Sequence, residues 1–185
     1  MRFKFQAVLW VILASLSCIA ASEEILPQVD KVQELSKLAK PAKAKVILLN
    51  MWGQKCSRCM TELPEIVRVV TALASNPDVA FIGLCIPEGE LKKDKTLADA
   101  CSAIAKKKQL NYPNYLWSGD GDALIDAFNI QGTPYNCLMT ADGKIIAELD
   151  IPEDPDKAVE YALAAIQKAL KDPIPKVRSA KWRRP

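Results

Sequence analysis

Residues 46–59 read VILLNMWGQKCSRC, and this stretch decides the fold class. It opens with a continuous apolar run, which is typical of a strand buried on both faces of a sheet. Cys56 and Cys59 follow it, with two residues between them, at the point where the spacing predicts that a helix begins. A CxxC motif that joins a buried strand to a helix is the setting that a redox-active pair of cysteines requires.

The surroundings of Cys56, the first cysteine of this motif, favour a thiolate more than those of Cys59 do. A side chain at a helix N-terminus faces unpaired backbone N–H groups and the positive end of the helix dipole. Lys55 and Arg58 add positive charge beside Cys56. We therefore expect the pKa of Cys56 to lie below the value of about 8.5 of a free cysteine. The thiolate would attack a substrate disulfide, and Cys59, within one helical turn, would resolve the mixed disulfide.

Two other interpretations of the motif stay open. A structural disulfide is one of them, although a bridge of this spacing closes a very small loop and gains little stability. A zinc half-site is the other, although the chain has no histidine and no second CxxC motif. We expect neither a metal nor an organic cofactor.

The rest of the chain alternates between strand and helix patterns, which predicts a layered α/β protein. The apolar periodicity and the turn residues predict helices over 23–40, 56–73, 97–108, 122–128 and 156–170, strands over 45–52 and 79–86, and a hairpin of 134–140 with 144–150.

The two ends of the chain differ in composition from the part between them. Residues 1–21 carry two basic residues, then a short apolar run and small residues, which indicates a secretory signal peptide. Cys18 offers lipidation as an alternative. We expect a helical lead-in over 22–44, the main domain over 45–172 and a flexible basic tail over 173–185 that could touch a membrane weakly. The protein is then expected to be exported, to the periplasm or another extracytoplasmic space, with a membrane anchor as an alternative.

Composition excludes several classes of function. The chain has 185 residues, of which 50% are hydrophobic and none is histidine. Without histidine, neither a Ser-His-Asp nor a Cys-His catalytic centre can form. A formal net charge of +3 is too small to indicate a nucleic-acid partner.

Two stretches together resemble a known family. Residues 46–65 and residues 128–134, with the turn and strand start at 141–145 after them, are similar to thioredoxin-fold proteins, and most similar to the exported TlpA/ResA-like thiol–disulfide oxidoreductases. The resemblance implies a central mixed β-sheet flanked by helices. It also implies that Cys56 attacks, that Cys59 resolves, and that Pro134 is a cis-proline next to the CxxC motif. The backbone of Thr133 would then pair with the substrate chain.

The resemblance extends to three further residues. Glu62 matches a partly buried acid that could take a proton from Cys59, although an exposed carboxylate in the first helical turn is an equal alternative. Trp52 is expected to contribute to the substrate-binding surface. Asn50 stands where thioredoxin has a buried aspartate, so a proton relay is not expected at that position.

Departures from the family pattern leave the direction of electron flow open. Ser57-Arg58 lacks the usual proline, and Lys55 replaces an aromatic residue. The resemblance implies a reductant of protein disulfides, such as that of an apocytochrome c, with a membrane thiol reductase as the electron donor. A disulfide oxidant or isomerase is one alternative, and a binding module with a structural disulfide is another.

The other three cysteines of the expected mature chain are Cys85, Cys101 and Cys137. We expect them to be buried free thiols that act as small apolar groups. The alternative is that one of them is a third redox partner of the CxxC motif. Cys137 is the best candidate, since it follows the Pro134 loop.

Overall fold

The computed structural model describes residues 25–39, 43–89, 91, 93–94 and 96–171. The expected signal peptide over 1–21, the lipidation alternative at Cys18 and the basic tail over 173–185 lie outside the described residues.

The described residues form a six-stranded mixed sheet in the order β1-β4-β3-β2-β5-β6. In the central strand pairs, β2 runs parallel to β3 and antiparallel to β5. The strands are β1 (Gln28–Val29), β2 (Val46–Trp52), β3 (Val79–Cys85), β4 (Asn114–Trp117), β5 (Tyr135–Met139) and β6 (Ile145–Leu149). This architecture confirms the predicted α/β class with a central mixed sheet.

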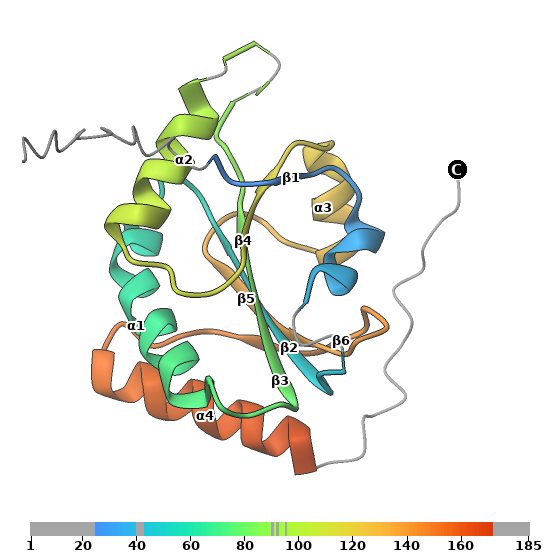
Figure 1. The fold of residues 1–185 in the computed structure, drawn as a ribbon, viewed down its shortest axis with the longest axis vertical. Helices are drawn as coiled ribbons and strands as arrows, with labels where there is room; N and C mark the ends of the chain where they lie inside the picture. Colours follow the sequence, from blue (N-terminus) through green and yellow to red (C-terminus); the bar gives the residue numbers. More distant parts are fainter. Residues whose placement is uncertain (1–24, 40–42, 90, 92, 95, 172–185) are drawn as a thin grey trace, which may run out of the picture.

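Helices cover both faces of this sheet (Figure 1). Leu48 of β2 packs with residues of α1 and α4, whereas Leu49 points to the other face and packs with residues of η1 and α3. This alternation follows from the two-residue period of a strand. The helices are η1 (Val32–Leu38, a 3-10 helix), α1 (Ser57–Leu73), α2 (Thr96–Lys107), α3 (Gly121–Phe128) and α4 (Pro155–Lys171).

Two features on the β1 side of the sheet correct the sequence-based prediction. The described part of the expected helix over 23–40 contains β1 and the short 3-10 helix η1 instead. Strand β4 was not expected, and it pairs in parallel with both β1 and β3. Both strands are very short, and tertiary pairing decides their conformation more than any local pattern of residues does.

Helix α1 continues through Pro64, whose nitrogen carries no hydrogen to donate. The carbonyl of Met60 therefore lacks its usual partner four residues later. The Nζ of Lys108, directly after α2, donates to this carbonyl oxygen over 2.7 Å. A charged donor from a neighbouring segment thus satisfies the group that the proline leaves open.

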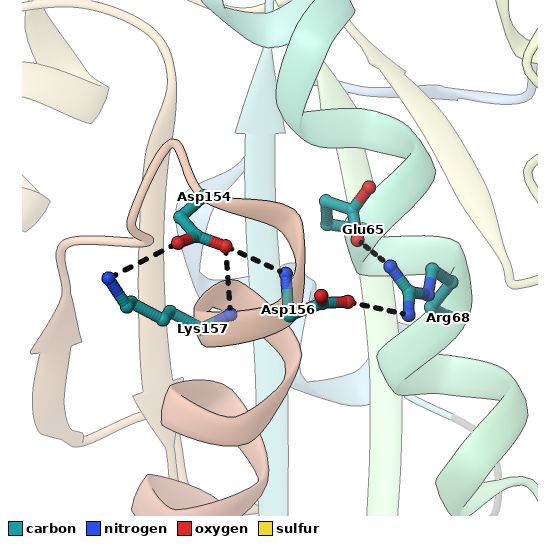
Figure 2. Close-up of polar contacts among 5 residues, drawn as sticks. All are labelled: Glu65, Arg68, Asp154, Asp156 and Lys157. Carbon is teal, nitrogen blue, oxygen red and sulfur yellow. Dashed lines mark hydrogen bonds and ion pairs between the residues drawn. The ribbon is translucent and has the colours of Figure 1, made fainter.

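Polar contacts at the surface connect α1 with the start of α4 (Figure 2). Arg68 lies 2.9 Å from a carboxylate oxygen of Glu65 and 3.6 Å from one of Asp156. Asp154 accepts hydrogen bonds from the backbone nitrogens of Asp156 and Lys157 and thereby caps α4. Exposed ion pairs contribute at most about 1 kcal/mol, so apolar packing is the main contact between these two helices.

Candidate active site

The CxxC motif lies where β2 ends and α1 begins, as predicted. Cys56 is the N-cap residue of α1 and forms a disulfide with Cys59. The backbone N–H of Cys59 donates to the Sγ atom of Cys56 over 3.0 Å. The same N–H would stabilise a thiolate on Cys56 after reduction, because a helix N-terminus favours negative charge.

The two sulfur-bearing side chains differ in accessibility. Cys56 is partly exposed, whereas Cys59 is 1% exposed and packs in an apolar cluster with Trp52 and Leu63. A protein substrate can therefore reach Cys56 but not Cys59. This difference in exposure fits the expected order, in which Cys56 attacks and Cys59 resolves, and these two roles stay a prediction.

The loop before β5 lies against the Cys56 sulfur. The peptide bond between Thr133 and Pro134 is cis, which confirms that expectation. The carbonyl oxygen of Thr133 lies 3.4 Å from the Sγ atom of Cys56. A Cβ atom on Gly53 would come within 3.1 Å of the Thr133 hydroxyl, so the glycine permits this close approach. The structure thus brings Thr133 and Pro134 to the CxxC motif, while their contact with a substrate stays a prediction.

Glu62 is buried, which decides between the two alternatives for its position. Its side chain is 7% exposed and accepts a hydrogen bond of 2.6 Å from Asn136. Burial raises the pKa of Glu62, while the hydrogen bond from Asn136 and the charge of Arg58 act in the opposite direction. Glu62 follows Cys59 by three residues and so lies on the same side of α1. A buried acid with a raised pKa beside a buried cysteine is suited to proton transfer.

A pocket of about 380 Å³ opens beside this acid. It is lined by residues 57, 58, 61, 62 and 65 of α1 and by 151–153 after β6. Arg58 at its rim donates to a carboxylate oxygen of Asp150 over 2.9 Å. The expected positive charge beside the motif is thus partly neutralised by an ion pair, although Lys55 remains exposed.

Trp52 does not occupy the position that the sequence suggests. Its side chain is 0% exposed, and its indole N–H donates to the side-chain oxygen of Asn114 over 3.3 Å. A fully buried indole cannot contact a substrate at the surface. The expectation that Trp52 binds substrate is therefore wrong for this structure, because the strand places the side chain in the core under α1 and α2.

The remaining cysteines also require a correction. Cys85 and Cys101 are not free thiols but form a second disulfide, with their Cα atoms 6.5 Å apart. Cys137 is free, as expected. However, its side chain is 0% exposed in the cluster beneath η1 and α3, and burial raises its pKa to about 12. The Cys56–Cys59 pair packs in a different cluster, so the structure does not favour Cys137 as a third redox partner.

The part of the chain that the structure describes contains no cluster of three or more potential metal-ligating residues. Within the same residues, no helix has the length and apolar character needed to cross a membrane.

Comparisons with known proteins support the fold. The thioredoxin domain of a thiol-disulfide oxidoreductase from Bacteroides vulgatus superposes with a TM-score of 0.54 at 18% identity, over 68% of this chain and 81% of that one. A thioredoxin-related protein from Neisseria meningitidis serogroup B gives 0.55 at 16% identity, over 70% of this chain and 88% of that one. Family models give no match, and curated proteins give none either. The chain therefore has a thioredoxin fold, with a CxxC disulfide at the start of α1.

Proposed function

We propose that the protein is an exported thiol–disulfide oxidoreductase that reduces disulfides of protein substrates. One observation carries the proposal. A disulfide at the N-terminus of α1 joins an accessible cysteine to a buried one, and the cis-proline loop lies against the accessible sulfur. The similar structure from Bacteroides vulgatus, described as a thiol-disulfide oxidoreductase, agrees with it.

The reaction needs two exchanges and no cofactor. In the reduced protein, the Cys56 thiolate attacks one sulfur of the substrate disulfide, and the other substrate sulfur leaves as a thiolate. Cys59 then loses its proton and attacks the Cys56 sulfur. The Cys56–Cys59 disulfide forms, the second substrate thiolate leaves, and two electrons have passed to the substrate. The oxidised pair is the state that this structure describes.

The position of Glu62 suits the resolving step when the exchange runs in the reductive direction. In that direction Cys59 must become a thiolate although it is buried, which burial alone opposes. A carboxylate on the same side of α1 can accept the proton. In the oxidative direction the same step runs in reverse, and Glu62 would return a proton to the leaving Cys59 thiolate, so the direction is decided by the reduction potential of the pair.

Export and partners complete the proposal. The composition of residues 1–21 and the second disulfide, Cys85–Cys101, both support an oxidising compartment, since disulfides persist there. A protein that reduces disulfides in such a compartment needs a supply of electrons. We propose a membrane thiol reductase as the donor and proteins with exposed disulfides, such as an apocytochrome c, as substrates.

The reduction potential of the Cys56–Cys59 pair tests this proposal. It is measured by equilibration with dithiothreitol buffers and thiol trapping, with a Cys56→Ala/Cys59→Ala variant as the control. A value near or below about −250 mV, together with reduction of a protein disulfide by the wild type alone, is the expected result. A value of about −120 to −180 mV would replace the reductant with an oxidant or isomerase. A pair that stays oxidised well below about −300 mV would leave a binding module with a structural disulfide.

A further inference from the structure

Four buried polar side chains form one continuous chain of hydrogen bonds that ends at Glu62. The Tyr112 hydroxyl donates to Oδ1 of Asn50 over 3.1 Å. Nδ2 of Asn50 donates to Oδ1 of Asn136 over 2.7 Å, and Nδ2 of Asn136 donates to Oε1 of Glu62 over 2.6 Å. All four side chains are at most 7% exposed, so water does not compete for these bonds.

The register of the sheet creates this series of hydrogen bonds. Asn50 of β2 pairs directly with Asn136 of β5, which places both side chains on the same face. Leu48 and Leu138, two residues away on each strand, lie in the core beneath α1 and α4. The two asparagines are therefore an amide pair within an otherwise apolar layer, at the point where α1 brings Glu62 to the sheet.

All three hydrogen bonds of this series run in the same donor-to-acceptor direction, from Tyr112 to Glu62. Each amide accepts through its oxygen and donates through its nitrogen, and the last donor reaches a carboxyl oxygen. Burial raises the pKa of Tyr112, so this group keeps its proton and stays a donor. Aligned bonds strengthen one another in a medium of low dielectric constant. Such a chain favours a carboxylate acceptor over a protonated one, because an ionised acceptor forms the stronger hydrogen bond.

We propose that Asn136 is a positioning residue that holds the Glu62 carboxyl in place and keeps it available as a carboxylate, with Asn50 and Tyr112 fixing the orientation of the Asn136 amide. This inference rests on the proposed function, in which Glu62 accepts the proton of Cys59. The amides themselves do not relay that proton. The proton instead leaves Glu62 through the pocket between α1 and the segment after β6.

Other charged groups also act on Glu62 and must be separated from the effect of Asn136. The facing groups are Arg58 and Glu65 from α1, Asp150 and Glu153 from the segment after β6, and Tyr112 from the segment before β4. The charge of Arg58 lowers the pKa of Glu62, and that of Asp150 raises it. None of these five belongs to the amide pair, so the pair can be changed while they stay.

The first test titrates Glu62 itself in the oxidised protein by carboxyl-carbon NMR. Cys59 cannot titrate in the disulfide, so the two groups are not coupled. In Asn136→Leu, the loss of the donor is expected to raise the Glu62 midpoint by about one pH unit. Thr140→Val removes another buried polar side chain, directly after β5, whose hydrogen bonds go to Asp142 and Lys144 and not to the four linked residues; it is the control and should leave the midpoint unchanged.

The second test measures the rate at which the reduced protein resolves a mixed disulfide, as a function of pH. The acid limb of this profile should move upward in Asn136→Leu by the same amount as the NMR midpoint, and it should vanish in Glu62→Gln. At pH values below the limbs of both proteins, the rate of Asn136→Leu should be about tenfold lower than that of the wild type. A lower rate at all pH values without movement of the limb would mean a merely structural role and would overturn the proposal.

The NMR result stands whether or not the protein reduces disulfides, so failure of the proposed function and failure of this inference are distinguishable. An unchanged Glu62 midpoint in folded Asn136→Leu overturns the inference even if the wild type is an active reductase. If that variant does not fold, the triple variant Asn50→Leu/Asn136→Leu/Tyr112→Phe replaces all the partners with apolar groups of similar shape. The same upward movement is expected there, and its absence would equally overturn the inference.

Discussion

Replacing Cys85 and Cys101 with alanine is expected to destabilise the protein by about 3 kcal/mol beyond the loss of the two thiols. The bridge joins the end of β3 to α2, over a sequence separation of 16. In the chain-entropy account, closing a loop of this length removes entropy from the unfolded state worth about 3 kcal/mol at 25 °C. For a domain of this size, that corresponds to a fall of about 10 °C in Tm.

The assay is thermal and urea unfolding, followed by circular dichroism, of the oxidised protein. The free cysteine provides a matched control, because Cys137 has the same 0% exposure as Cys85 and Cys101 but forms no bridge. Cys137→Ala therefore measures the cost of truncating one buried thiol. If the double variant loses no more stability than twice this cost, the bridge does not constrain the unfolded chain and the reasoning fails.

Three further predictions concern single groups. Lys108→Met should cost about 1.5–3 kcal/mol in urea unfolding, because the carbonyl of Met60 loses its charged donor, whereas Lys108→Arg should cost less. Since burial raises the pKa of Glu62, the unfolded chain ionises this group first as the pH rises. Stability should therefore fall from about pH 4.3 upward until folded Glu62 ionises, and this part of the fall should be missing in Glu62→Gln when unfolding is measured from pH 4 to 8. After selective reduction of the CxxC pair, iodoacetamide should modify Cys56 within the folded state, while Cys137 should react only in denaturant, as peptide mass spectrometry can check.

The sequence predicted those parts of the fold that depend on local pattern. The apolar run over 46–49 identified the central strand, and the cysteine spacing located the start of α1 within one residue. Strands β1 and β4 escaped prediction because their two and four residues are fixed by pairing, β1 with β4 and β4 also with β3. A strand of that length has no periodicity for a pattern to detect.

The candidate site was predictable where residues are close in sequence and less so where they are not. Cys56 and Cys59 need only one helical turn to meet, and the resemblance supplied the Pro134 loop. Asn136 lies 74 residues from Glu62, and nothing in its own surroundings marks it as a partner of that acid. A signal was nevertheless available, since an asparagine in an apolar strand costs free energy unless a buried partner satisfies it.

The two disulfides can serve opposite purposes because their exposure differs. A dithiol donor can approach the Cys56 sulfur, whereas both cysteines of the second bridge are fully buried against the sheet. Thiol–disulfide exchange requires direct contact of the attacking sulfur with the disulfide, so the same reductant should open the first bridge and leave the second intact. The second bridge attaches α2 to the strand that neighbours β2, whose end carries the CxxC motif. The Cys56–Cys59 pair can therefore pass through its reduced state while the covalent link between β3 and α2 is kept.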